Sequence, residues 1–287
     1  MTKTIVVTGA TGTIGRRAVE LLAAQKASVT ALVHSADKAA PLEQLGARTA
    51  VGDFNDRASL ERAFAGADTV VLITPPGPHA YEQTITALEA AKTARVRKIV
   101  RVSALKAGVD GPTDNTRQHG RTEAAIKASG LTYVILRPHL FFQNLFGSLP
   151  TILGEGKVYF GVGDGKMGLI DTRDASDAVV AAATRSDFDG ETIELTGPAS
   201  ITYHDVAAAL SRALGREITY VPVPPAAAGE AIRGWGDWAA TVITDYCTAY
   251  SKNWGDFTTG EVQRLTGHAP RSADDFAREV LAPAARG

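Results

Sequence analysis

Residues 4–15 of this 287-residue chain read Thr4-Ile5-Val6-Val7-Thr8-Gly9-Ala10-Thr11-Gly12-Thr13-Ile14-Gly15. β-Branched residues lead into three glycines spaced by three, and residues 16–24 then repeat apolar side chains at helical spacing. The stretch therefore predicts a strand, a tight turn and a helix. In such a turn Gly9 would allow the sharp bend, Gly12 the approach of a pyrophosphate, and Gly15 the packing of helix on strand.

A helix that starts directly after a glycine turn leaves backbone N–H groups free, and these groups can bind a phosphate. We therefore expect the turn to hold a dinucleotide through Gly9, Thr11, Gly12, Thr13, Ile14 and Gly15. The spacing G-x-x-G-x-x-G differs from the commoner G-x-G-x-x-G, so a glycine-rich turn that binds nothing is the alternative.

Strands and helices alternate along the first half of the chain. Strands are expected at residues 28–33, 49–51, 69–73, 98–102 and 132–136, and helices at 42–45, 59–64, 80–95 and 120–129. Alternation at this pitch requires right-handed crossovers between parallel strands. The sequence thus predicts an α/β fold with a Rossmann-type, doubly wound parallel sheet.

The pattern changes after residue 140. Six glycines between 154 and 168 predict a loop, helices are expected at 174–184 and 203–214, and strands at 192–195 and 218–223. The aromatic residues 235, 238, 246, 250 and 254 are expected to pack in a core. We predict an NAD(P)-binding Rossmann domain at 1–150 and a smaller C-terminal α/β lobe at 151–287 that covers the substrate, with chain exchange between the two left open.

Composition narrows the range of partners. The net charge is −1 with 21% charged residues, which disfavours nucleic acid as a partner. The longest apolar runs are strand-sized and no signal peptide is recognised, so we expect a cytoplasmic protein that does not enter a membrane. Cys247 is the only cysteine and the six histidines lack ligand spacing, so no metal is expected. A monomer and a homodimer both remain open.

Ligands of such sheets bind outside the carboxyl ends of the strands. Beyond the glycine turn, the expected cofactor contacts at these ends are His34, Ser35, Lys38, Asp53, Phe54, Thr74, Pro75, Ser103 and Pro138. Asp53 could accept a hydrogen bond from the adenine amino group while Phe54 lines the ring. A turn or a helix N-cap is the alternative role for this aspartate.

The end of the second strand indicates which cofactor is preferred. No carboxylate follows Val33 directly, and Ser35, Lys38 and Arg16 could donate to a 2′-phosphate, with His34 beside them. NADP is therefore favoured over NAD. In the alternative, these charges are solvated and Asp37 turns inward to bind NAD.

Several motifs together resemble one known family. They are residues 7–15, Gly52-Asp53-Phe54, Val102-Ser103, residues 129–133 with Leu136-Arg137-Pro138, Gln143-Asn144, and Thr266-Gly267 with Pro270-Arg271-Ser272. This set resembles the atypical short-chain dehydrogenase/reductases, and within them the NmrA-like group, which includes NADPH-dependent quinone oxidoreductases. The resemblance spans nearly the whole chain and implies a Rossmann fold that binds NADP(H).

The chain departs from the family at its usual catalytic signature. Active members carry Tyr-x-x-x-Lys on the helix before the sixth strand, and here His119 and Glu123 occupy those positions. The serine that family members carry after the fifth strand is present here as Ser103. Residues i and i+4 share a helix face, so His119 and Glu123 are expected to look into one crevice.

Two functions are compatible with this substitution. In the first, NADPH reduces a quinone or similar conjugated carbonyl above Ser103, His119 supplies a proton or a hydrogen bond, and Glu123 orients the imidazole. His139, Phe142 and Asn144 would line the acceptor, and Pro138 would back the nicotinamide. In the second, the chain is a non-catalytic NADP(H)-binding sensor of the NmrA type.

Overall fold

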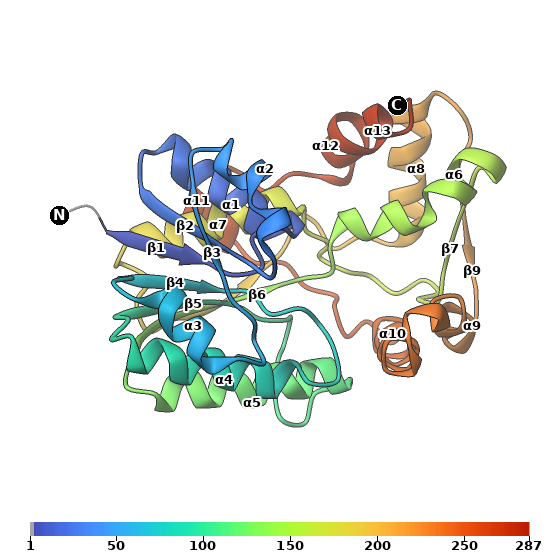
Figure 1. The fold of residues 1–287 in the computed structure, drawn as a ribbon. Helices are drawn as coiled ribbons and strands as arrows, with labels where there is room; N and C mark the ends of the chain where they lie inside the picture. The colour runs from blue at the N-terminus through green and yellow to red at the C-terminus, as the bar shows by residue number, and fades with distance from the viewer. Residues whose placement is uncertain (1–2, 287) are drawn as a thin grey trace. The chain divides into compact units, whose positions relative to one another are not determined.

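A seven-stranded parallel sheet forms the centre of the computed structural model, which describes residues 3–286 (Figure 1). The strand order is β3-β2-β1-β4-β5-β6-β8. The strands are β1 (Thr4–Val7), β2 (Ser28–Val33), β3 (Arg48–Val51), β4 (Thr69–Leu72), β5 (Lys98–Val102), β6 (Thr132–Pro138) and β8 (Thr192–Leu195). The predicted doubly wound α/β fold is confirmed.

Helices cover both faces of this sheet. Figure 1 shows α1 (Thr13–Ala24) and α7 (Thr172–Thr184) on one face, and α3 (Arg57–Phe64), α4 (Ala80–Thr93) and α5 (Asp114–Ala128) on the other. The short helix α2 (Ala40–Glu43) precedes β3. Because both faces are covered, β4 and β5 are buried at every position, which explains the apolar run of β4 and leaves Lys98 and Arg101 of β5 buried as well.

The strand order reverses next to β1, which pairs with β2 on one side and β4 on the other. Val7 at the end of β1 is in register with Ala31 on β2 and Val71 on β4. The chain leaves this central position directly into the glycine turn. The turn therefore lies at the switch point where open α/β sheets bind their ligands.

The chain folds into two compact units. The first comprises residues 1–111, 115–137 and 175–194, and the second comprises 112–114, 138–174 and 195–287. Residues 175–194 thus return to the first unit after the chain has entered the second. The assignment of a cofactor role to 1–150 and a substrate role to 151–287 stays a prediction.

The second unit has its own small sheet, in which β7 (Lys157–Phe160) pairs in parallel with β9 (Thr219–Pro222). Its helices are α6 (Leu149–Glu155), α8 (Tyr203–Leu214), α9 (Pro225–Glu230), α10 (Asp237–Tyr250), α11 (Glu261–Thr266), α12 (Ala273–Phe276) and α13 (Ala282–Ala284). Tyr250 is fully buried and packs against Tyr246 and Trp254.

Three expectations from the sequence were wrong. The glycine-rich stretch 154–168 is not all loop, because it contains β7. Helix α5 begins at Asp114, six residues before the expected start at 120. Trp235 is 80% exposed and does not join the aromatic core. Within residues 3–286, no helix combines the length and apolar character needed to span a bilayer.

Candidate functional site

The glycine turn is built on two close backbone approaches. Gly9 has a positive φ of 59°, and its carbonyl oxygen accepts a 3.0 Å hydrogen bond from the Gly12 N–H. A Cβ on Gly15 would lie only 2.2 Å from that same Gly9 oxygen. The turn is therefore possible only because position 15 has no side chain and position 9 tolerates the left-handed region.

Helix α1 begins at Thr13 directly after the extended Gly12, which provides no side-chain cap. An open hollow of about 350 Å³ lies against this helix start. The hollow is lined by Thr11, Gly12, Thr13, Arg16, Arg17 and Glu20. Uncapped N–H groups, small residues and two guanidiniums are the donor set that a diphosphate requires, so the residues present fit a dinucleotide.

The two arginines of the hollow differ in their surroundings. Arg16 is exposed. Arg17 Nη2 lies 3.4 Å from Asp177 Oδ1 on α7, and its Nε is buried without a hydrogen-bond partner among the described residues. Arg17 therefore retains donor capacity beside the glycine turn.

The ends of β2 and β3 bring the predicted adenosine contacts near one another. His34 Nδ1 lies 4.0 Å from Asp53 Oδ2, and His34 is exposed. Asp53 Oδ1 accepts a 2.8 Å hydrogen bond from the backbone N–H of Asn55, which is the turn role considered as its alternative. The cap of α3 is Asp56, not Asp53. Phe54 packs partly against the sheet core.

Asp37, the alternative ribose acceptor, is engaged locally. Its carboxylate pairs with Lys38 Nζ at 3.3 Å, and hydrogen bonds from Ser35 and Lys38 lower its pKa. All three side chains lie at or near the surface. Lys38 is thus held at the end of β2, where a 2′-phosphate was expected.

A buried cluster follows β5 and includes the three residues expected to be catalytic. Ser103 Oγ donates to Glu123 Oε1 at 2.6 Å and lies 3.3 Å from His119 Nδ1. His119 and Glu123 lie on α5, one turn apart, as their spacing predicted. The structure therefore brings Ser103, His119 and Glu123 together.

Glu123 does not orient His119. Its carboxylate pairs with Arg137, through Nε to Oε1 at 2.9 Å and Nη2 to Oε2 at 2.6 Å. Arg137 also donates to Glu194 Oε1 at 3.0 Å. Burial alone would lower the pKa of Arg137, but its hydrogen bonds and ion pairs with Glu123 and Glu194 raise it. The expected contact of Glu123 with the imidazole is wrong, because Arg137 binds both oxygens of the carboxylate.

The partner of His119 is Arg101, which the sequence did not single out. Arg101 is 1% exposed and its Nη2 lies 3.3 Å from His119 Nδ1. Burial lowers the pKa of Arg101 to about 10, and burial followed by the charge of Arg101 lowers the pKa of His119 well below its usual value. One signal was available, because Lys-Ile-Val-Arg-Val places an arginine inside a strand that is otherwise expected to be buried.

The ends of β4 and β5 are joined by the same arginine. Arg101 Nη1 donates to Thr74 Oγ1 at 2.5 Å and to the Leu72 carbonyl oxygen at 3.2 Å. Thr74 Oγ1 is 2.8 Å from Thr84 Oγ1 on α4. Thr74 therefore lies in the cluster, whereas its neighbour Pro75 is exposed.

The predicted acceptor-lining residues belong to the second unit. His139 is 1% exposed, its Nε2 lies 3.0 Å from the Gly255 oxygen, and its Nδ1 accepts from the Leu140 N–H at 2.7 Å. Phe142 is 1% exposed and stacks on Phe276. Both side chains make packing contacts, and their role in lining the acceptor stays a prediction.

Pro138, which ends β6, is also buried. Asn144 alone among the predicted acceptor contacts is exposed. The roles of Pro138 beside a nicotinamide and of Asn144 beside an acceptor stay predictions.

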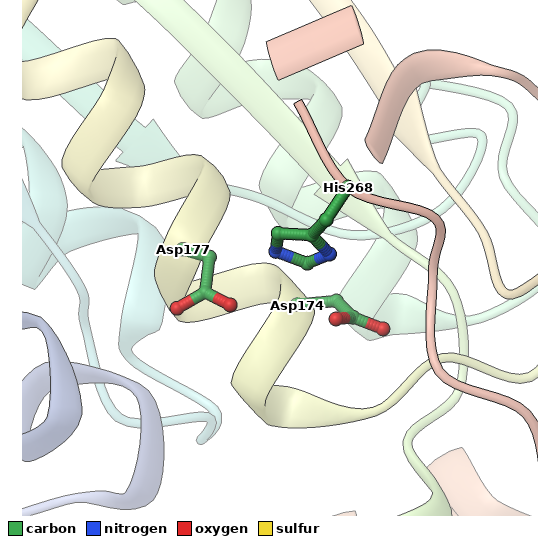
Figure 2. Close-up of side chains that lie close together, drawn as sticks. All are labelled: Asp174, Asp177 and His268. Atoms are coloured by element: carbon green, nitrogen blue, oxygen red, sulfur yellow. The ribbon is translucent and has the colours of Figure 1, made fainter. Parts of the chain in front are cut away.

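Acidic and histidine side chains on α7 and after α11 are drawn in Figure 2, which labels Asp174, Asp177 and His268. In the second unit, Asp174 Oδ2 accepts a 2.7 Å hydrogen bond from the Arg271 N–H, and its other oxygen pairs with the Arg271 guanidinium. His268 Nδ1 lies 2.9 Å from the Ala269 oxygen. The absence of a metal stays a prediction.

Comparisons with known proteins agree with this architecture. A family model described as NAD(P)H-binding matches residues 9–185. The chain is 33% identical over 277 residues to an NAD(P)H azoreductase of Xenophilus azovorans, covering 96% of each chain. It is 28% identical over 270 residues to quinone oxidoreductase 2 of Escherichia coli, covering 92% of this chain and 94% of that protein.

Solved structures give the same result. The structure of an NADPH-dependent quinone oxidoreductase of Escherichia coli complexed with NADPH superposes with a TM-score of 0.88 at 26% identity, covering 96% of this chain and 99% of that one. A mutant of NmrA superposes with a TM-score of 0.78 at 21% identity, over 97% and 95% of the two chains, which shows the fold alone. The chain therefore belongs to the NAD(P)H-binding family.

Proposed function

We propose that the protein is an NADPH-dependent reductase that acts on a quinone or a similar conjugated carbonyl. The observation that carries this proposal is the glycine turn at the sheet switch point, whose uncapped helix start and paired arginines suit a dinucleotide diphosphate. The azoreductase and quinone oxidoreductase relatives support reduction of a small conjugated molecule.

Bound NADPH would supply a hydride, that is, two electrons and one hydrogen. The chain's own residues would bind and orient the cofactor through residues 9–15 and through Arg16, Arg17 and Lys38. Lys38 and the arginines favour NADPH over NADH, because a 2′-phosphate needs cationic donors and the nearby Asp37 is already paired. Asp53 and Phe54 are proposed to contact the adenine.

The cluster after β5 provides the polar groups of the proposed reaction. Ser103 and His119 supply hydrogen-bonding atoms, while the buried Glu123, held by Arg137, fixes the Ser103 hydroxyl. No Tyr-x-x-x-Lys is present, so the chain lacks the general acid that carbonyl reduction by typical family members uses. Acceptors whose reduced form is already stabilised, such as quinones, are the substrates that this cluster suits.

A non-catalytic NADP(H)-binding sensor is the other function that the sequence allowed. The likeness to NmrA at 21% identity concerns the fold, and it does not favour this function over reduction. Three expectations stay predictions. They are that the protein is cytoplasmic, that it does not bind nucleic acid directly, and that it is a monomer or a homodimer.

Two measurements test the proposal. NADPH and NADH are titrated into the protein while the fluorescence of the reduced nicotinamide is followed, and a panel of quinones and azo dyes is then assayed for NADPH oxidation. We expect NADPH to bind more tightly than NADH and at least one quinone to be reduced. If neither nucleotide binds below about millimolar concentration, the cofactor assignment is wrong. If NADPH binds but no acceptor oxidises it, the reductase proposal is wrong and the non-catalytic sensor is the remaining function.

A further inference from the structure

The deepest unexplained charge in the first unit is Arg101. Arg101 is 1% exposed, and burying a guanidinium is costly. The next residue in the sequence, Val102, is an ordinary core residue. The arginine has no carboxylate within hydrogen-bonding distance among the described residues; its donors go to Leu72 O, Thr74 Oγ1 and His119 Nδ1. Its Nε is buried without a partner. A buried cation with this set of acceptors is not a structural ion pair.

The hydrogen bonds that start at Arg101 form a chain in which each group donates to the next. Thr84 Oγ1 donates to the Ala80 oxygen at 2.6 Å, so Thr74 Oγ1 donates to Thr84, and Thr74 in turn accepts from Arg101 Nη1. Every step is a donor facing an acceptor. At the other side of the guanidinium, Nη2 can only donate, because arginine has no acceptor atom.

This direction determines the state of the imidazole. Nδ1 of His119 faces the Nη2 donor at 3.3 Å, and a proton on Nδ1 would point at the cation. The Ser103 hydroxyl, also 3.3 Å from Nδ1, gives its proton to Glu123 at 2.6 Å, so its oxygen could only accept a hydrogen bond from the ring. At the same distance the positive charge of Arg101, which can only donate, decides against a proton on Nδ1. Nδ1 must therefore carry the lone pair, which leaves the single ring proton on Nε2.

The Nε2 edge of His119 is available to a ligand. Among residues 3–286 the ring makes no other hydrogen bond, and the only buried side-chain nitrogens or oxygens without partners are on Arg17 and Arg101. Nε2 is thus reachable by solvent, and His119 keeps part of its surface exposed. The titratable and charged groups around the ring are Arg101 on β5, Glu123 on α5 and Arg137 on β6.

We propose that Arg101 is a positioning residue that locks His119 as a neutral Nε2–H hydrogen-bond donor to the acceptor oxygen. This inference rests on the proposed reductase function. NADPH, when bound, would supply a hydride, and its addition would leave a negative charge on the acceptor oxygen. His119 stabilises that charge without giving up its proton, and water supplies the proton that completes the two-electron reduction. The pH-independent donor replaces the tyrosine acid of typical family members.

The first test needs no turnover. The ¹⁵N chemical shifts of His119 in uniformly labelled protein report which ring nitrogen carries the proton, with His119→Gln used to assign the signal. We expect one tautomer, with the proton on Nε2, and no titration between about pH 5.5 and 8.5. A proton on Nδ1, or a titration near pH 6.5, overturns the proposal.

The second test concerns the arginine. In Arg101→Gln the His119 signals should shift toward a mixture of tautomers, and turnover of the best quinone should fall about tenfold or more with the affinity for NADPH unchanged. Lys98→Gln is the matched control, since Lys98 is a buried cation at the other end of β5 whose ammonium donates to the Arg185 carbonyl oxygen and pairs with Asp189. It should alter neither the His119 signals nor turnover. An unchanged tautomer in Arg101→Gln overturns the proposal.

A comparison at position 119 stays decisive even where Arg101→Gln does not fold. His119→Gln retains an N–H donor and should keep turnover within about tenfold of the wild type, whereas His119→Ala should lose about a hundredfold. Equal losses in the two variants would mean that His119 acts as an acid. An active enzyme whose His119 titrates normally overturns this inference alone, while a locked His119 in a protein that reduces no acceptor overturns the proposed function alone.

Discussion

The guanidinium of Arg137 binds the carboxylate of Glu123 through two parallel hydrogen bonds, 2.9 Å from Nε to Oε1 and 2.6 Å from Nη2 to Oε2. Glu123 is 2% exposed, so its carboxylate is shielded from water. The same carboxylate accepts the Ser103 hydroxyl. A fork-to-fork pair of this kind fixes both partners and, through them, the serine.

Removing the charge of Glu123 should therefore destabilise the protein. We expect Glu123→Gln to lower the free energy of unfolding by about 2–4 kcal/mol, because it replaces the buried charge partner of the half-buried Arg137 by a neutral amide. Lys127 is a matched control, since its Nζ is 4.0 Å from the same carboxylate but its side chain is 41% exposed. Lys127→Ala should cost less than about 0.5 kcal/mol. Urea unfolding of the two variants checks this, and equal losses would contradict it.

The two later glycines of the turn should fail in different ways. A Cβ at position 15 would lie 2.2 Å from the Gly9 oxygen, so Gly15→Ala should lower stability by about 2 kcal/mol or more. At position 12 the nearest atom would be 3.3 Å away and φ is −82°, so Gly12→Ala should fold but bind NADPH more weakly. Thermal unfolding and NADPH titration separate the two effects. A Gly12→Ala variant with unchanged NADPH affinity would remove the turn from the cofactor site.

His119 should make the protein sensitive to acid. Its pKa is lowered in the folded state by burial and by Arg101, so the unfolded chain binds the proton more readily. Stability is full above the unfolded pKa of about 6.5 and falls as the pH drops below it. His119→Gln removes this contribution, so the difference in unfolding free energy between pH 7.5 and 5 should be smaller in the variant. An identical pH dependence would show that the imidazole titrates normally.

Reversing the charge of Arg16 should change cofactor preference. Arg16 lines the hollow beside the glycine turn, so Arg16→Glu should weaken NADPH binding about tenfold or more and NADH binding much less. Lys92→Glu carries the same charge change on α4, which covers the other face of the sheet (Figure 1), and should affect neither nucleotide. Fluorescence titration with both nucleotides gives the answer. Equal losses for NADPH and NADH would argue against a 2′-phosphate contact.

His139 should contribute to stability and not to substrate binding. Its ring stacks on Tyr250 at a centroid distance of 5.6 Å and hydrogen-bonds the Gly255 oxygen. His139→Ala should therefore cost about 2–4 kcal/mol of stability while leaving KM for the acceptor unchanged. Asn144→Ala, at an exposed position, should change stability by less than about 0.5 kcal/mol. A stable His139→Ala protein with a raised KM would restore the predicted acceptor contact.

The sequence alone was sufficient for the doubly wound sheet and its cofactor turn. Both depend on local patterns, since strand and helix periodicity and the spacing of Gly9, Gly12 and Gly15 are set by neighbours in the chain. The i to i+4 placement of His119 and Glu123 on one helix face follows from the same local geometry. These features need no knowledge of what packs against them.

Tertiary structure decided what those side chains do. Glu123 is paired with Arg137 from β6, and His119 with Arg101 from β5, because parallel strands bring residues distant in the chain to one end of the sheet. Burial of Arg101 could not be inferred from its charge, nor could the packing of His139 on Tyr250 across 111 positions of sequence. Such pairings depend on which elements become neighbours, and that is settled by the collapse of the whole chain and not by any segment of it.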